Sequence, residues 1–253
     1  MTLKIRIIPT LLWDGISLVK GSKFNNWRRI GALLPALKVY NQRMVDELIV
    51  VDINATKDQR SPDWRWVEEF SSECFVPLTV GGGVRTLEDI QRLLWAGADK
   101  VCINSALFEQ PSLLRESVGE FGSQCIVASI DVQRFTDGPV ACYAKSGQIK
   151  VERDVVSWAK EVETRGAGEI LLTSIDRDGT MSGYDVALVK KISESVKIPV
   201  IASGGAGTAE HIHEVICAGG ASAVSAASMF HFTQQTPLEV KKYLQKKGIL
   251  VRI

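Results

Sequence analysis

The sequence lacks a cysteine pair at metal-ligand spacing, a surplus of charge of either sign, and an apolar run long enough to cross a membrane. The formal net charge is only +1, which gives no electrostatic reason to expect nucleic acid or a membrane surface as a partner. Neither a disulfide framework nor a zinc site is expected, because the cysteines are scattered and odd in number. They are Cys74, Cys102, Cys125, Cys142 and Cys217.

The N-terminal stretch MTLKIRIIPTLL lacks the design of a secretory signal peptide. With free thiols expected, this favours a cytoplasmic protein. No motif implies an organic cofactor or a metal ion.

Short apolar runs alternate with amphipathic, helix-like segments along the whole chain. Eight strand-then-helix units within 253 residues predict an α/β protein, a (β/α)8 TIM barrel with its active site at the C-terminal ends of the strands. An open doubly wound sheet is the competing architecture. The predicted strands are Ile5–Leu12, Glu47–Asp52, Pro77–Val80, Lys100–Asn104, Cys125–Asp131, Glu169–Ser174, Pro199–Ser203 and Ser222–Ala226.

An internal repeat favours the closed barrel. The stretch PLTVGGGVRTLEDI, which begins at Pro77, aligns without gaps with PVIASGGAGTAEHI, which begins at Pro199, at an offset of 122 residues. Such a repeat predicts one domain, residues 1–253, built from two fused half-barrels of about 1–122 and 123–253.

Glycine-rich turns follow two predicted strands that the repeat relates. Glycine allows positive φ angles and close backbone approach, so N–H groups can converge on a phosphate, although many such turns are only tight turns. Two related turns predict a ligand with a phosphate at each end, lying across the barrel mouth. The candidate residues are Gly82, Gly83, Asn104 and Ser105 in one half and Gly204, Gly205, Ala227 and Ser228 in the other.

Carboxylates lie at or shortly after the ends of three predicted strands: Asp52, Asp131, and the pair Asp176 and Asp178. Asp131 and Asp178 would face the mouth, where a carboxylate can act as general acid or base, although a helix cap or a loop salt bridge is the simpler interpretation of either. Aligning the first and fifth strands by their apolar ends sets Leu12 opposite Asp131, so a symmetric two-acid mechanism would need an acid at position 12.

Two longer segments follow the first and the fifth predicted strands. Gly15–Asn26 is expected to be a polar loop that could act as a lid, in which Lys20 either reaches a phosphate or is merely solvated. Phe135–Lys150 is expected to be a β-hairpin with Asp137-Gly138 as its turn.

Charges stand at the opposite ends of the strands. Arg6, Glu47, Lys100 and Glu169 each lie at or next to a strand start, and two cations with two anions sum to zero. They are therefore predicted to form an ion-pair layer at the barrel floor, either purely structural or a gate for a small molecule entering from below.

The motifs LTVGGGVRTLED, ADKVCINSA, FGSQCIVASID, RGAGEILLTSIDRDGTMSGYD and IPVIASGGAG resemble the cyclase subunit of imidazole glycerol phosphate synthase, over essentially the whole chain. That family takes ammonia from a glutaminase subunit docked on the floor, passes it through the barrel and uses it on a substrate with two phosphates. The resemblance implies an ammonia gate at Arg6, Glu47, Lys100 and Glu169, glutaminase docking at Asp99, and mouth carboxylates at Asp131 and Asp178. It also implies phosphate contacts at Gly83, Asn104, Ser105, Gly179, Gly205, Ala227 and Ser228.

The sequence departs from the family pattern at Leu12, where the family has an aspartate that serves as acid or base in cyclisation. Leucine can neither donate nor accept a proton. The pattern IPTLL resembles a branch of barrel paralogues found with surface-polysaccharide genes and associated with amidination of a sugar. An authentic cyclase, a non-catalytic scaffold that conducts ammonia, and the related single-chain isomerase of the same pathway are the alternatives.

Overall fold

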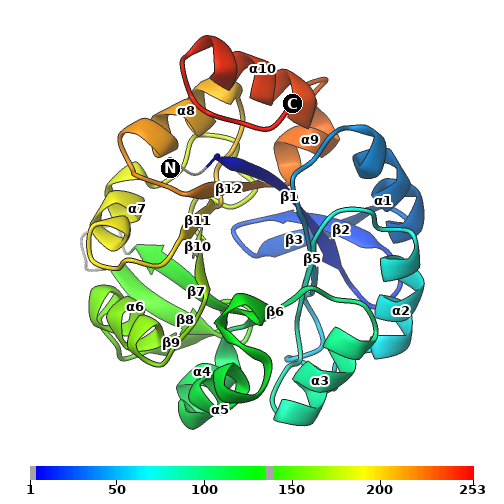
Figure 1. The fold of residues 1–253 in the computed structure, drawn as a ribbon, viewed down its shortest axis with the longest axis vertical. Helices are drawn as coiled ribbons and strands as arrows, with labels where there is room; N and C mark the ends of the chain where they lie inside the picture. Colours follow the sequence, from blue (N-terminus) through cyan, green and yellow to red (C-terminus); the bar gives the residue numbers. More distant parts are fainter. Residues whose placement is uncertain (1–3, 135–139) are drawn as a thin grey trace.

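The computed structural model describes residues 4–134 and 140–253 and folds them into a closed ring of eight parallel strands surrounded by helices (Figure 1). The ring closes because β10 pairs with both β7 and β11, so the doubly wound alternative is wrong and the predicted TIM barrel is confirmed. The barrel strands are β1 (Arg6–Trp13), β4 (Leu48–Asp52), β5 (Leu78–Gly81), β6 (Lys100–Ile103), β7 (Ile126–Arg134), β10 (Glu169–Ser174), β11 (Val200–Ser203) and β12 (Ala223–Ala226).

Alternation along each strand divides the core into two parts. In β1, Ile7, Leu11 and Trp13 point outward into the large cluster formed with the helices, whereas Ile8 points into the barrel. The two faces explain why the strands read as continuous apolar runs. The interior cluster consists of Ile8, Ile49, Cys102, Val127, Leu171, Ile201 and Ala223.

Helices cover the outside of the barrel, and threonines begin several of them. Thr86 and Thr236 each form a capping box with an acid three residues on, and Thr208 caps at the position that the repeat relates to Thr86. The helices are α1 (Leu33–Gln42), α2 (Trp64–Ser72), α3 (Leu87–Trp95), α4 (Ser105–Glu109), α5 (Ser112–Phe121), α6 (Val155–Thr164), α7 (Val186–Ser193), α8 (Ala209–Cys217), α9 (Ser228–Phe232) and α10 (Pro237–Lys246).

The predicted strand bounds need small corrections, and one segment was wrong. The strand β1 continues to Trp13 and β7 continues to Arg134, because antiparallel hairpins extend both of them. The segment Gly15–Asn26 is not a polar loop: it contains β2 (Leu18–Ser22) and the start of β3 (Asn25–Gly31).

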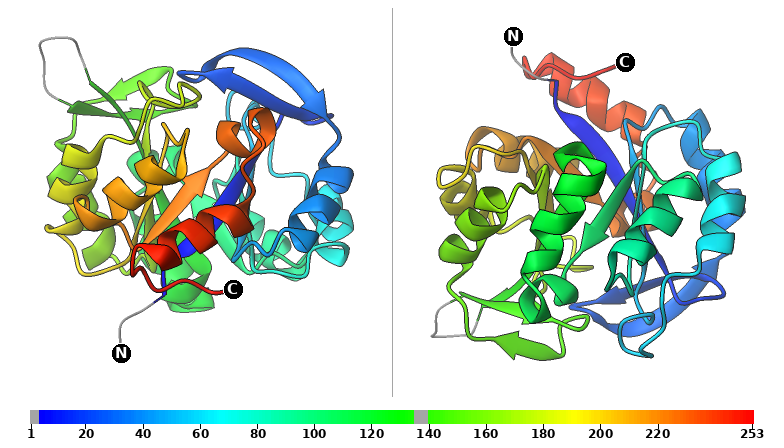
Figure 2. Two further views of the ribbon diagram at one scale, coloured as in Figure 1. Left: turned by 90° about the horizontal axis from the view of Figure 1, so that it is seen from above. Right: turned by 60° about the horizontal axis from the view of Figure 1, so that its bottom comes forward.

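The second hairpin after a barrel strand consists of β8 (Val140–Ala144) and β9 (Ile149–Val151), which continue the antiparallel pairing from β7. The Asp137-Gly138 turn predicted there lies outside the described residues. Both hairpins stand over the C-terminal ends of the barrel strands, while the C-terminus of the chain lies at the opposite end (Figure 2). The mouth is therefore the covered end of the barrel, and the strand starts form the other face, which we call the floor.

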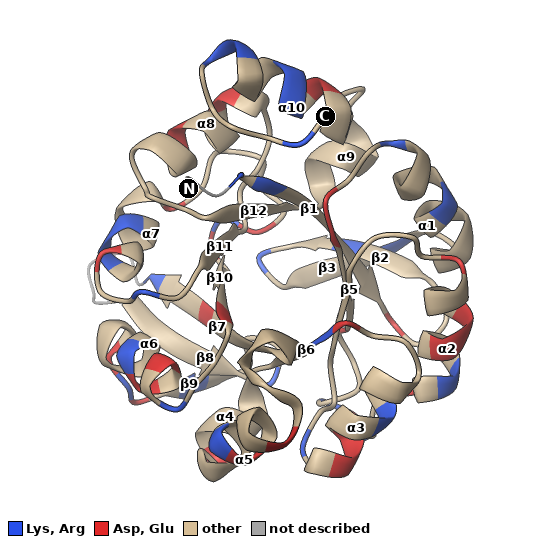
Figure 3. Ribbon diagram, viewed as in Figure 1, with Lys and Arg blue, Asp and Glu red and all other residues tan. Residues whose placement is uncertain are grey.

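Charged residues of both signs are spread over the outer helices, including α3 and α6 (Figure 3). Within residues 4–134 and 140–253, no helix is both long and apolar enough to cross a membrane.

Candidate active site

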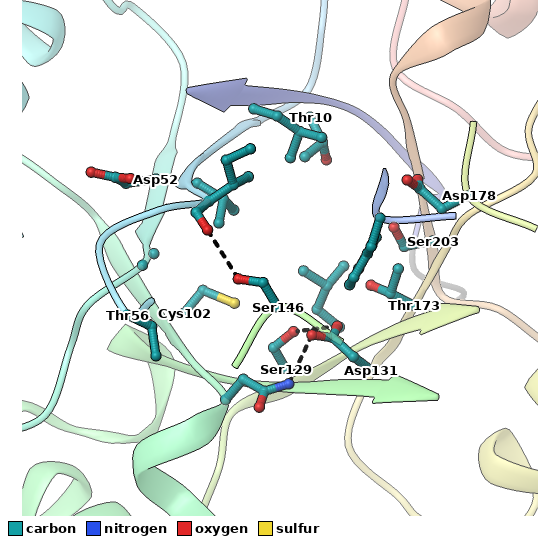
Figure 4. Close-up of a pocket in the computed structure, with 18 of the residues that line it drawn as sticks. Thr10, Asp52, Thr56, Cys102, Ser129, Asp131, Ser146, Thr173, Asp178 and Ser203 are labelled. Atoms are coloured by element: carbon teal, nitrogen blue, oxygen red, sulfur yellow. Dashed lines mark hydrogen bonds between the residues drawn. The ribbon is translucent and has the colours of Figure 1, made fainter. Parts of the chain in front are cut away.

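A cavity of about 240 Å³ opens at the mouth and is lined by residues from all eight barrel strands or the loops that follow them. In Figure 4, Asp131, Ser129 and Thr173 lie together on one side, and Asp52 and Thr56 lie on the opposite side. The predicted acids, glycine turns and small polar residues therefore meet in one place. Only Lys20, among the predicted mouth residues, does not line this cavity.

Asp131 lies on β7 with its carboxylate in the cavity wall. Asn104 donates from Nδ2 to Asp131 Oδ2 at 2.9 Å, and Ser129 donates to Oδ1 at 3.4 Å. Burial raises the pKa of Asp131 to about 7, with a further contribution from the charge of Asp178, while the hydrogen bond from Ser129 opposes the shift. A carboxyl group with a pKa near neutrality can both give and take a proton, which suits a general acid or base.

Asp178 and Lys20 carry opposite charges near Asp131; the Lys20 side chain is buried and Asp178 is half-buried. Burial raises the pKa of Asp178, and Lys20 opposes that shift. Burial lowers the pKa of Lys20 to about 8, and Asp178 opposes that shift in turn. The Lys20 ammonium donates to the carbonyl oxygen of Thr10 at 3.2 Å and is almost fully buried. Lys20 therefore lies behind the cavity wall, and its predicted phosphate contact stays a prediction.

Leu12 lines the cavity, as the alignment with β7 requires. Ile8 and Val127 belong to the same interior cluster, and four residues along each strand the alternation leads from them to Leu12 and Asp131. An aspartate at position 12 would face the same cavity as Asp131. The side chain there is apolar, so one of two equivalent positions has no proton to exchange.

The glycine turns have a structural reason that is independent of any ligand. Gly82 has a φ of +102°, and a Cβ there would lie 2.2 Å from the carbonyl oxygen of Asp52. Gly204 has a φ of +89°, and its Cβ would lie 2.5 Å from the carbonyl oxygen of Ser174. Both glycines let one strand exit pass close to its neighbour, so a phosphate is not needed to explain them.

The other predicted phosphate residues also lie at the cavity, and some of their polar groups are occupied. Gly83 donates its N–H to Thr56 Oγ1 at 3.1 Å, and Ser105 Oγ accepts the N–H of Lys145 at 2.9 Å. Gly179 packs against the backbone of Gly21 in the β2–β3 hairpin. The cavity lining includes Gly82, Gly83, Asn104, Ser105, Gly179, Gly204, Gly205, Ala227 and Ser228, whose phosphate roles stay predictions.

The four floor charges form a closed ring. Arg6 Nη1 lies 2.7 Å from Glu47 and 2.8 Å from Glu169, and Lys100 Nζ lies 3.0 Å and 3.3 Å from the same two carboxylates. The side chains are only 9–17% exposed. Each cation contacts both anions, so the ring is neutral and its charges compensate one another.

A layered column connects this ring to the mouth. Two residues beyond each ring member stands a member of the interior apolar cluster: Ile8, Ile49, Cys102 and Leu171. On five strands, the residue two positions after the member of the interior apolar cluster has a hydroxyl side chain that lines the cavity. These residues are Thr10, Ser129, Thr173, Ser203 and Ser225. The axis of the barrel therefore passes from charge through a thin apolar layer to hydroxyl groups.

Sequence reasoning missed several polar residues of the site. Ser146 and Lys145 line the cavity from the β8–β9 turn, and Thr10 and Ser225 share a hydrogen bond of 2.5 Å inside the barrel. The period-2 alternation from Arg6 would have found Thr10, whereas β12 carries no floor charge from which Ser225 could be found in the same way. No local signal would have placed Lys145 and Ser146 at the mouth.

One stability prediction follows from Asp131. Because its folded pKa is raised, the folded chain holds a proton that the unfolded chain loses above about pH 4. The contribution of this group to stability therefore falls from about pH 4 to about pH 7 and stays low above that. Asp131→Asn removes the charge, so we expect it to stabilise the chain by about 1 kcal/mol at pH 8, or roughly 2–4 °C in Tm. Thermal unfolding from pH 4 to 8 measures this, and a gap that does not grow with pH would contradict it.

The fold and the mouth together define a barrel enzyme: a closed (β/α)8 barrel whose C-terminal mouth carries acid–base candidates and a ligand-sized cavity. A family model described as histidine biosynthesis protein matches residues 6–236, and the chain belongs to that family. The match supports a barrel enzyme of the isomerase or cyclase type, with chemistry like that of the histidine pathway.

Proposed function

We propose that this chain is the synthase barrel of a glutamine amidotransferase: it receives ammonia at the floor and uses it on a phosphate-bearing substrate at the mouth. The observation that carries the proposal is the floor ring with the layered column above it. In an isomerase that binds its whole substrate at the mouth, a neutral ion-pair ring leading to an apolar layer would have only a structural role.

The ring suits a small neutral molecule. Its four charges sum to zero, so it neither attracts nor traps ions. Each carboxylate contacts two cations, so one contact can break while the other still holds the charge. Ammonia that passes would cross the thin apolar layer and reach hydroxyl groups that can hydrogen-bond it next to Asp131.

Leu12 bears on which reaction follows. Without an acid at that position, ring closure of the histidine-pathway substrate lacks one of its two proton-transfer groups. We therefore favour a paralogue that serves amidination of a surface-polysaccharide sugar over an authentic imidazole glycerol phosphate synthase cyclase. A scaffold that only conducts ammonia and activates its glutaminase is the remaining alternative.

The test is an assay with ammonium salt and the histidine-pathway substrate. We expect wild type to make imidazole glycerol phosphate far more slowly than a true cyclase does. Production at a normal rate would show instead that this chain is an authentic cyclase with another acid or base in place of position 12.

The floor also offers a surface for a glutaminase partner. Phe75 and Trp95, at 80% and 79% exposed, and Met44 stand in the segments that lead into β5, β6 and β4. The repeat relates Phe75, Trp95 and Met44 to Lys197, Cys217 and Gly166, respectively. The same fold positions thus carry no large apolar side chain in the other half, so barrel folding does not require the exposed aromatics. A partner seated off-centre, over the starts of β4 to β6, would explain them.

Trp95 gives a cleaner test of docking than Asp99. The Asp99 carboxylate accepts the N–H of Leu78 at 2.8 Å, so reversing its charge would disturb β5 as well as any interface. Trp95→Ser is expected to raise the Kd for the glutaminase about 30-fold, since a central aromatic contact is typically worth about 2 kcal/mol or more.

The matched control is Cys217→Ser, at the exposed floor position that the repeat relates to Trp95. Binding is measured by titration of the purified glutaminase into each variant. Equal affinities for all three proteins would rule out docking over β4 to β6.

A further inference from the structure

The β8–β9 hairpin carries its turn across the mouth to the opposite side of the barrel. The first two residues of its four-residue turn, Lys145 and Ser146, have φ angles of +52° and +56°, a left-handed conformation unusual for residues other than glycine. Ser146 donates from Oγ to the carbonyl oxygen of Ile53 at 3.0 Å, just beyond the end of β4 (Figure 4). The turn is therefore anchored over the cavity despite its strained backbone.

The β2–β3 hairpin does the same from the other half of the barrel. Its turn residues Lys23 and Phe24 have φ angles of +55° and +57° and precede Lys145 and Ser146 by 122 residues, the offset of the repeat. Lys23 donates its N–H to the carbonyl oxygen of Asp178 at 2.8 Å. The two hairpins are thus equivalent arms, and each holds a lysine at the first position of its turn.

Only one of the two lysines belongs to the cavity. Lys145 lines it, whereas Lys23 is exposed and does not. The Lys145 backbone N–H donates to Ser105 Oγ at 2.9 Å, which fixes the turn against the first residue of α4. The Lys145 ammonium lies 3.3 Å from Glu109, the last residue of the same short helix.

The ion pair between Lys145 and Glu109 is weakly held. Both side chains are well exposed, at 40% and 57%, and an exposed pair of this kind contributes little because solvent screens it. A phosphate dianion carries more charge and more acceptor oxygens than a carboxylate, so it would be the stronger partner for the ammonium. Two other cations on this side of the mouth also have partners: Arg60 contacts Asp52, and Arg85 donates to the carbonyl oxygen of Gln59.

We propose that Lys145 is the cation that recognises the ligand phosphate in the cradle of the N-terminal half, at Gly83, Asn104 and Ser105, and that Glu109 holds the ammonium until the phosphate displaces it. The inference rests on the proposed function, because it assumes the phosphate-bearing ligand. It adds a specificity residue from a turn that belongs to the other half of the chain. The β8–β9 hairpin, which belongs to the C-terminal half of the chain, would thereby help to select the phosphate that the N-terminal half binds.

The experiment titrates inorganic phosphate into ¹⁵N-labelled protein and follows amide shifts. Gly83 and Ser105 report on the N-terminal-half cradle, and Gly205 and Ser228 report on the other. We expect Lys145→Asn to raise the Kd at the first cradle about tenfold or more, as the loss of a charge-assisted hydrogen bond should, and to leave the second unchanged. Asparagine is chosen because it tolerates the left-handed turn.

Two further variants complete the test: one should change the phosphate affinity in the opposite direction, and the other is a control. Glu109→Gln removes the competing carboxylate, so it should lower the Kd at the first cradle several-fold. Lys23→Asn makes the same substitution in the equivalent arm and should change neither cradle. The inference is overturned if Lys145→Asn and Lys23→Asn behave alike. If wild type binds phosphate at neither cradle, the phosphate-bearing substrate of the proposed function falls together with this inference, and that outcome is distinct from the first.

Discussion

Leu12→Asp is expected to raise the rate of ammonia-dependent cyclisation of the histidine-pathway substrate by about 10²–10⁴, the usual contribution of one positioned acid or base. The side chain at position 12 already lines the cavity, on the interior face of β1. Thr10 and Ser129 stand one layer below Leu12 and Asp131. The new carboxylate would therefore enter a mouth whose other acid, Asp131, has a pKa near 7.

The controls separate proton transfer from shape. Leu12→Asn has the size and polarity of aspartate without an ionisable group, so it should stay at the wild-type rate. Adding Asp131→Asn to Leu12→Asp should remove the gain, because the mechanism needs both groups. Product formation is followed with ammonium salt in place of the glutaminase, so that docking plays no part.

Each other outcome has a definite meaning. If Leu12→Asp gains nothing although the substrate binds, the mouth has changed at more than one residue and is shaped for another acceptor. If Asp131→Asn in the otherwise unchanged chain leaves the pathway product unaffected, the barrel is a scaffold that conducts ammonia. Both results would leave the floor ring and its role intact.

The floor ring and Leu12 could be found from sequence because both depend only on the period of a strand. Arg6, Glu47, Lys100 and Glu169 each begin or directly precede a strand, and strand starts must meet at one end of a barrel. The repeat then supplied the partner of position 12. What the spacing could not provide was the alternating contact of each cation with both anions, since this depends on side-chain conformations.

The β2–β3 hairpin was missed for a physical reason. Every residue of β3 except the partly buried Ile30 is exposed, so the strand has no apolar alternation by which it could be recognised. Its turn uses Lys23 and Phe24 in the left-handed conformation, where sequence patterns lead one to expect glycine or asparagine. Burial of Lys20 follows from this hairpin, because β2 pairs with β1 and carries the side chain down to Thr10. The predicted loop would have let Lys20 either reach a phosphate or be solvated, and gave no reason to expect its burial.

Lys241→Met is expected to lower the free energy of unfolding by about 3–5 kcal/mol, the usual effect of removing one partner of a buried ion pair. The Lys241 ammonium lies 2.8 Å from Asp46, and both side chains are only 2% exposed. It also donates to the carbonyl oxygen of Met44, and Asp46 accepts the N–H of Ile7 at 2.8 Å. Methionine fills the space but leaves the Asp46 charge buried and unpaired, so Tm should fall by about 10 °C.

The double variant Lys241→Met with Asp46→Asn tests this reason. Asparagine keeps an acceptor for the N–H of Ile7 without the charge. The double variant should therefore lose much less free energy of unfolding than the sum of the losses in the two single variants. Losses that simply add would mean that packing of α10, and not the buried charge, sets the effect. Ile7 and Asp46 directly adjoin Arg6 and Glu47, so the same contact holds two members of the floor ring in place. Ammonia transfer from a docked glutaminase should therefore weaken in Lys241→Met below its melting temperature, and recover in the double variant as the stability does.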